Sequence, residues 1–507
     1  MFDVIYYKLQ QLFKSQTTKI AVLIFVIALC YGYEFFNLNL TIDEELNIGS
    51  IGAISGWVAQ ARWGMWILGA LVMPATVVPT VSVLVGVCFT LLAVYFIIMD
   101  AFQLDDVAAT FVAALVITIP SYCFIFTFST IAYGIGVGFA TLSIAYFLVR
   151  SGGWYQVAIA AMLAGFSIGI YQSFIIVIFL IACLIIWIQI ELGETKFIQY
   201  ALIKPSVLFF GGIVVYILVD KILRAVLGIE LDYVGQFINF GSFFQSPWQY
   251  LLASIKRIVD LVGLSSDIFG LHSFWLIVAM FLALFILIFK SQKQNSLKKN
   301  IVLALFILLA WVVCVFADAV SIGSAPIRAF IYLPVVIGFT LAAGYCRAGK
   351  SLSFLLSVIV ILAIVSNSVI SNHLFASNAY AAKQDAVLAT EIIQEVGRLQ
   401  PDLLSNNTLK LELVGEHGWP VTSVMTKSET FGASFFEWDG GNRYRVAAYL
   451  RTWGLNTVVV GNEERLKIRK YAQEMHCWPT PGWVSIHNGI LIVKLSDYTP
   501  FQDTQQE

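Results

Sequence analysis

Long apolar runs alternate with short polar segments over the first three quarters of the chain. Each run is about 16 to 22 residues long, close to the length with which a helix crosses a bilayer. The pattern therefore predicts a polytopic α-helical membrane body over 1–372 with about eleven transmembrane helices. The predicted spans are 20–38, 81–99, 107–127, 133–149, 156–172, 174–190, 205–222, 271–289, 301–319, 329–346 and 352–372.

After residue 372 the pattern changes to one typical of a soluble α/β domain. Asn488-Gly489 separates two apolar runs, and this dipeptide favours the two-residue turn of a β-hairpin. We expect a C-terminal soluble α/β domain over 373–507 that closes with this hairpin. Helical periodicity is present at 379–398, 442–453 and 462–475, and strand patterns at 408–414 and 458–460.

Composition and charge support the division into two parts. Hydrophobic residues make up 59% of the chain and charged residues 12%, about half the usual charged share. Of the 135 residues from 373 on, 27 are charged, against 34 of the 372 before them. The net charge of −1 provides no basic surface for nucleic acid. We therefore expect membrane lipids as partners, and no DNA or RNA.

Basic residues in the loops predict the orientation in the membrane. With a cytoplasmic N-terminus, the loops on that side carry 12 lysines and arginines, and the opposite loops carry at most 6. An odd number of spans then places residues 373–507 outside, which in a bacterium is the periplasm. We expect a multi-pass protein of the bacterial inner membrane.

Two of the expected external loops, 39–80 and 223–270, are longer than a turn, and such loops often carry function. Within the first, residues 66–79 are apolar but short and end at proline, which predicts a re-entrant or interfacial segment. The second is rich in aromatic residues, which either form a membrane-interface belt or stack on sugar rings.

The first loop begins with three consecutive acids, Asp43, Glu44 and Glu45. Thr41 and Glu44 have the spacing of a helix capping box, which explains one acid without a catalytic role. Three carboxylates exceed what a cap needs, and successive helical residues point in different directions, so capping and catalysis can coexist. The cluster is a candidate source of a general base.

Two arginines, Arg62 and Arg328, lie on the side where basic residues are rare. A single arginine there often only extends its charge to lipid headgroups. A pair beside an acidic cluster favours a phosphate site, because a guanidinium binds an oxyanion through two hydrogen bonds. We assign Trp63, which follows Arg62, and Tyr171-Gln172 to a substrate cavity, with a polar turn between two spans as the alternative for Tyr171-Gln172.

Other kinds of site find little support. The five histidines show no ligand spacing, so we expect no metal and no cofactor. The glycines of "YGIGVGFA" lie inside a span and indicate close helix packing rather than a nucleotide loop. Sugar nucleotides are cytoplasmic, so a sugar activated outside the membrane is expected on a lipid phosphate. Because phosphate leaves readily as an anion, one base and cations to hold the phosphate suffice.

The chain shares short motifs with one known family along nearly its whole length. It resembles the serotype-converting O-antigen glucosyltransferases of phage and prophage cassettes, which are GT-C membrane glycosyltransferases. The motifs are "IDEELNIG" with the following "ARW", "GIYQSF", "APIRAFIYLP", "GASFFEWDGGNRYRVAAYL" and "CWPTPGWVSIHNGILIVKL".

This resemblance implies a GT-C-like fold and an inverting transfer of glucose from undecaprenyl-phosphate-glucose to a lipid-linked O-antigen polysaccharide in the periplasm. It also implies partner proteins that synthesise and flip the donor. The base of the family is an acid of the first external loop, which maps onto Asp43 first and Glu44 next, with Glu45 possible. The family's usual glycine before Arg62 is Ala61 here, while the arginine is retained.

Two other functions stay open. A lipid-linked sugar flippase or transporter normally buries ionisable residues at mid-membrane, whereas Glu34, Asp220 and Asp318 lie toward span ends. An O-antigen polymerase or ligase is expected to rely on arginine-rich external loops without an acid in the first loop. The acceptor sugar and its linkage are not encoded in any motif that we recognise.

Overall fold

The computed structural model describes residues 2–37, 39–46, 53–72, 79–192, 198–229, 240–289, 297–321, 325–404, 408–500 and 502. The chain forms two compact units. Unit 1 comprises Met1–Phe36 and Ile51–Asn372, and unit 2 comprises Asn37–Ser50 and His373–Glu507. The start of the predicted first external loop therefore belongs to unit 2. Parts of both predicted long loops lie outside the described residues.

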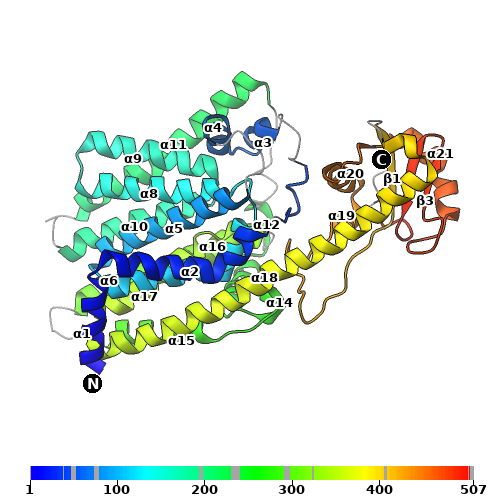
Figure 1. Ribbon diagram of the computed structural model, residues 1–507. Coiled ribbons are helices and arrows are strands. Elements are labelled where there is room, and N and C mark those ends of the chain that lie inside the picture. Colours follow the sequence, from blue (N-terminus) through cyan, green and yellow to red (C-terminus); the bar gives the residue numbers. More distant parts are fainter. Residues whose placement is uncertain are drawn as a thin grey trace. The chain divides into compact units, whose positions relative to one another are not determined.

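Unit 1 is built from helices (Figure 1). Its helices are α1 (Phe2–Phe13), α2 (Gln16–Phe36), α3 (Ala53–Ala59), α4 (Trp63–Leu71), α5 (Pro79–Phe102), α6 (Asp106–Thr118), η1 (Pro120–Tyr122), α7 (Cys123–Phe126), α8 (Ala132–Ser151), α9 (Trp154–Ile170), α10 (Phe174–Leu192), α11 (Ile198–Leu227), α12 (Phe240–Gln245), α13 (Pro247–Val262), α14 (Ser266–Phe269), α15 (Trp275–Phe289), α16 (Leu297–Val320), η4 (Ile327–Ala329), α17 (Leu333–Arg347) and the start of α18 (Lys350–Leu399).

Among the described residues, seven helices are long and apolar enough to cross a membrane. The predicted span 107–127 is not one straight helix, because the chain bends by 50° between α6 and Pro120. Proline lacks the backbone N–H that would continue α6 and its ring clashes with the preceding turn. Counting this bent pair gives an eighth span, and α9, α15 and α17 are shorter apolar helices at predicted spans. The total of eleven spans stays a prediction.

Glycines allow two helices of unit 1 to pack closely, as the sequence indicates. A Cβ atom on Gly136 of α8 would lie 2.6 Å from the carbonyl oxygen of Val85 and 2.7 Å from the Cα atom of Gly86, both on α5. Real Cβ atoms do not approach backbone so closely, so the contact requires glycine. The prediction of close packing in "YGIGVGFA" is confirmed.

The predicted helices 352–372 and 379–398 are a single helix, α18, of 50 residues. No proline or glycine interrupts the sequence between them, and the change from apolar to polar residues alters the surroundings of a helix without ending it. Residues before His373 belong to unit 1 and those from His373 on to unit 2.

Unit 2 contains a four-stranded sheet with the strand order β2-β1-β4-β3. Strand β1 pairs in parallel with β2 and β4, whereas β3 and β4 are antiparallel. Asn488 and Gly489 both have positive φ, 51° and 76°, as the predicted hairpin turn requires. The elements are η5 (Pro401–Leu404), β1 (Leu409–Val414), α19 (Trp438–Gly441), α20 (Arg443–Thr452), β2 (Thr457–Val459), α21 (Asn462–Glu474), β3 (Val484–His487) and β4 (Ile490–Lys494).

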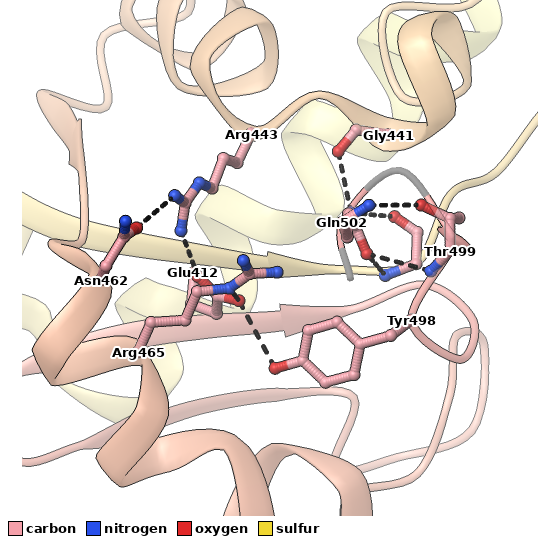
Figure 2. A network of polar contacts seen from close by, with 9 residues as sticks. Glu412, Gly441, Arg443, Asn462, Arg465, Tyr498, Thr499 and Gln502 are labelled. Atoms are coloured by element: carbon pink, nitrogen blue, oxygen red, sulfur yellow. Dashed lines mark hydrogen bonds and ion pairs between the residues drawn. The ribbon is translucent and has the colours of Figure 1, made fainter. Parts of the chain in front are cut away.

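A buried charge network joins the sheet to two helices (Figure 2). Glu412 of β1 is fully buried and accepts hydrogen bonds from Arg465 of α21 at 2.8 Å and from Arg443 of α20 at 3.5 Å. The hydroxyl of Tyr498 donates to the same carboxylate at 3.4 Å. Removing one partner of such a network leaves a buried charge without compensation, so the network fixes the packing of α20 and α21 on β1.

Candidate active site

The acidic segment forms a turn in unit 2. The backbone N–H of Thr41 donates to the Glu44 carboxylate at 3.1 Å, and the N–H of Glu44 donates to the Thr41 carbonyl at 2.9 Å. Ile42, which is 2% exposed, anchors the segment in the hydrophobic core of unit 2. The capping contact between Thr41 and Glu44 therefore forms, although residues 42–46 are turns and not a helix.

Arg445 of α20 binds two of the three acids. Its Nη2 atom donates to Asp43 Oδ1 and its Nη1 atom to Glu45 Oε1, both at 2.8 Å. A third bond runs from Nε to Asp439 Oδ2, again at 2.8 Å. One guanidinium thus holds three carboxylates, and its planar set of donors fixes the directions of Asp43 and Glu45 relative to each other.

The three adjacent acids differ in accessibility. The Asp43 side chain is 41% exposed, whereas Glu44 and Glu45 are each 1% exposed. Burial raises the pKa of Glu45 from its ordinary 4.5 to about 7, even though the positive charge of Arg445 acts in the opposite direction. Asp43 is therefore the most accessible acid of this cluster.

A second group of predicted residues surrounds a turn between α3 and α4 in unit 1. The Arg62 guanidinium lies over the Tyr171 ring at 4.8 Å and near the Trp57 ring at 5.8 Å. Ala61 precedes it with φ of 56°, a conformation that glycine adopts without strain. The turn therefore keeps the geometry expected of a glycine although this chain has alanine.

Gln172 and Trp63 hold this turn in place. The Gln172 side-chain amide donates to the carbonyl oxygens of Gln60 at 2.8 Å and Ala61 at 3.2 Å. Trp63 is 4% exposed and packs on Gly169, where any Cβ atom would lie 2.5 Å from the indole ring. Both side chains thus position Arg62, and Trp63 is part of the helix packing rather than an open surface.

Arg328 lies in η4, with its guanidinium 4.9 Å from the centre of the Phe128 ring. A further arginine, Arg257 of α13, reaches the same loop. It pairs with the buried Asp318 at 2.9 Å, donates to the carbonyl of Ala325 and lies 5.0 Å from the Phe330 ring. Two guanidinium groups are therefore held at the segment that carries "APIRAFIYLP".

The structure places the predicted site residues in two sets. Asp43 and Glu45 are joined through Arg445, and Arg62, Tyr171 and Gln172 meet at the turn before α4, whereas Arg328 contacts a different ring, that of Phe128. The sets are Asp43, Glu44 and Glu45 in unit 2, and Arg62, Trp63, Tyr171, Gln172 and Arg328 in unit 1.

Sequence reasoning missed three side chains at these positions: Arg445, Asp439 and Arg257. Arg445 and Asp439 lie inside "GASFFEWDGGNRYRVAAYL", which carries the family resemblance but gives no reason to pair Arg445 with an acid 400 positions away. Arg257 was counted only as a loop charge. Within the described ranges, no group of three His, Cys, Asp or Glu side chains is arranged to hold a metal ion.

Comparisons with known proteins assign the family. Neither curated proteins nor solved structures gave a match. A family model described as glucosyl transferase GtrII matches residues 32–344, more than half of the chain, and this range includes the three acids and both predicted arginines. The chain therefore belongs to the glucosyl transferase GtrII family and is a glycosyltransferase.

Proposed function

We propose that this glycosyltransferase moves glucose from undecaprenyl-phosphate-glucose to a sugar of the O-antigen repeat, with inversion, at the periplasmic face of the bacterial inner membrane. The family supports glucosyl transfer. The observation that carries the choice of base is the exposure of Asp43, because its two neighbours are buried in structural contacts. Donor synthesis and donor flipping then belong to partner proteins.

In the proposed reaction, Asp43 accepts the proton of an acceptor hydroxyl as its oxygen attacks the anomeric carbon of glucose. The bond between this carbon and the phosphate oxygen breaks, and its electron pair leaves with undecaprenyl phosphate. No general acid is needed, because the phosphate leaves as a stable anion. Attack opposite the leaving group inverts the anomeric centre.

The proposed phosphate ligands are Arg62 and Arg328. A guanidinium stabilises charge that develops on the leaving phosphate, and its fixed plane of donors suits two phosphate oxygens. The Tyr171 ring contacts the Arg62 guanidinium, and Gln172 fixes the backbone directly before Arg62. Trp63 stabilises the same turn by packing on Gly169 of α9.

Reconstituted transfer tests this function. Purified protein in lipid nanodiscs receives synthetic undecaprenyl-phosphate-glucose and lipid-linked O-antigen from cells that lack the gene. We expect one added hexose per repeat by mass spectrometry, and by NMR a glucosidic linkage of opposite anomeric configuration to the donor. Movement of donor across the bilayer without a hexose increment would instead establish a flippase, and longer chains without added hexose would establish a polymerase.

A further inference from the structure

Three half-buried aromatic side chains form a cluster in unit 2. The ring of His417 lies 4.6 Å from that of Trp419 and 4.5 Å from that of Trp478, and the two indole rings are 6.3 Å apart at 90°. Each of the three side chains keeps part of its surface exposed. The cluster is therefore accessible, and its rings face in several directions.

The two tryptophans are held in place by hydrogen bonds to carboxylates of α18. Trp419 Nε1 donates to Asp385 Oδ1 at 2.7 Å, and Trp478 Nε1 donates to Glu391 Oε2 at 2.9 Å. Asp385 is fully buried and also accepts from the Ser434 hydroxyl at 2.7 Å. Because the rings are already ordered, a ligand that stacks on them loses little free energy to immobilising side chains.

A charged pair lies against the same segment. Lys427 Nζ donates to both carboxylate oxygens of Glu437, at 2.8 and 2.7 Å, and both side chains are about one third exposed. Gly418, between His417 and Trp419, lacks the Cβ atom that would collide with the Glu437 carboxylate. The pair thus presents donors and acceptors beside the aromatic cluster.

His417 adds an unused polar atom. Its Nε2 atom is buried and has no hydrogen-bond partner among the described residues. Burial is the main cause that lowers the pKa of His417; the Glu437 charge acts in the opposite direction and the Lys427 charge in the same one. The imidazole is therefore neutral at pH 7 and can either donate or accept a hydrogen bond. His417 therefore contributes the face of a neutral ring to the cluster rather than a charge.

We propose that His417, Trp419 and Trp478, together with Lys427 and Glu437, bind a segment of the acceptor polysaccharide. Aromatic faces pack against the C–H faces of sugar rings, and the adjacent lysine and carboxylate serve neighbouring hydroxyls. Acids outnumber bases here and disfavour an anionic ligand: Asp385 and Glu391 bind the two indoles, and Glu416 and Glu437 lie near Lys427. This inference rests on the proposed transfer to O-antigen.

Direct binding tests this site without catalysis. The probe is O-polysaccharide released by mild acid from cells that lack the gene, titrated calorimetrically into full-length protein in nanodiscs without donor. We expect His417→Ala to weaken binding about threefold to tenfold, the range of a single aromatic contact, and Lys427→Met, which removes a hydrogen-bond donor, to weaken it by a similar factor. The acceptor KM should rise by the same factor while the donor KM stays unchanged.

His487→Ala is the matched control, because His487 also stacks on an exposed aromatic ring of unit 2, Tyr471, at 4.2 Å. Trp478→Phe keeps a ring in place if larger changes unfold the domain, and it should bind better than His417→Ala. Wild-type affinity and KM in both His417→Ala and Lys427→Met would overturn the site while leaving glucosyl transfer standing. Polysaccharide binding by a wild-type protein that transfers no glucose would reject the proposed function instead.

Discussion

At the scale of single residues, three adjacent acids occupy three different environments because the chain turns sharply at Asp43, whose φ is 88°. Glu44 points back to the Thr41 N–H, and Glu45 is buried against Arg445. Aspartate and asparagine tolerate positive φ better than most residues, so an asparagine at position 43 preserves the turn. Asp43→Asn therefore keeps the turn and removes the carboxylate that would accept the proton, together with one charged partner of Arg445.

We expect Asp43→Asn to lower glucosyl transfer about 10²- to 10⁴-fold, the usual contribution of a general base. The protein should still fold and insert, because asparagine keeps the size and the turn. Transfer by the purified variant is measured beside Glu44→Gln and Glu45→Gln, with melting temperatures for all three. Normal turnover in Asp43→Asn together with loss of turnover in Glu44→Gln would identify Glu44 as the base. Normal turnover in all three refutes a base in the first loop.

Glu45 makes stability depend on pH. Its pKa is about 7 in the folded protein against an ordinary 4.5, so the unfolded chain loses this proton first as the pH rises. The contribution of Glu45 to the free energy of unfolding is therefore largest below about pH 4.5. This contribution falls by about 3 kcal/mol as the pH rises through 7. We expect the melting temperature of Glu45→Gln to depend less on pH between 5 and 8 than that of the wild type. Glu474→Gln, at an exposed acid of α21, should keep the wild-type slope; equal slopes in all three proteins contradict the assignment.

At the scale of elements, the turn between α3 and α4 is held by a residue from the connection between α9 and α10. Gln172 donates two hydrogen bonds to the carbonyls of Gln60 and Ala61, directly before Arg62. Ala61 has positive φ, so the turn does not relax into this shape by itself. The direction of Arg62 therefore depends on Gln172.

We expect Gln172→Ala to raise the donor KM about threefold to tenfold, the effect of losing hydrogen bonds of ordinary strength. Arg62→Ala and Arg328→Ala should weaken donor use more, with normal protein levels, and lysine at either position should not restore it fully. Gln103→Ala is the control, because Gln103 also donates to a backbone carbonyl, that of Asp100, at 2.6 Å. Full activity of the lysine variants excludes two-bond recognition of phosphate, and unchanged activity of the alanine variants removes both arginines from the site.

Local patterns predicted the elements of the fold that depend on local chemistry. The hairpin at Asn488-Gly489, the strand at Leu409–Val414 and the close packing at Gly136 follow from turn, alternation and glycine signals. The pairing of Arg445 with Asp43 joins residues 402 positions apart, and no spacing encodes such a contact. The same holds for Arg257 and Asp318, which meet only after the helices pack.

At the scale of the whole molecule, three ion pairs of unit 1 connect helix ends that the loop charges assign to the same side of the membrane. Each pair joins residues at the boundaries of two spans, where water and headgroups reduce the cost of charge. Charges at helix ends suit a static scaffold better than a coupled transporter, which needs ionisable groups along its pathway. The pairs on the predicted cytoplasmic side are Lys19–Asp106, Arg150–Asp100 and Arg347–Glu191.

Contacts of the N-terminal helix indicate the orientation without a count of spans. Asp3 of α1 accepts a hydrogen bond from Ser351 of α18 at 2.9 Å, and the rings of Phe2 and Phe354 stack at 5.3 Å. The N-terminus and the start of α18 therefore lie on the same side of the membrane. If α18 crosses the bilayer once, residues after its span emerge on the opposite side.

We therefore predict that the N-terminus is cytoplasmic and that residues 373–507 are periplasmic, since the basic loops lie on the side of the N-terminus. Alkaline phosphatase fused after residue 507 should be active, because it folds only in the periplasm, and green fluorescent protein at the same position should be dark. Fusions after residue 349, before α18 begins, are the matched controls and should give the reverse pattern. An inactive phosphatase with a bright fluorescent fusion at residue 507 would reverse the orientation and remove Asp43 from the periplasm.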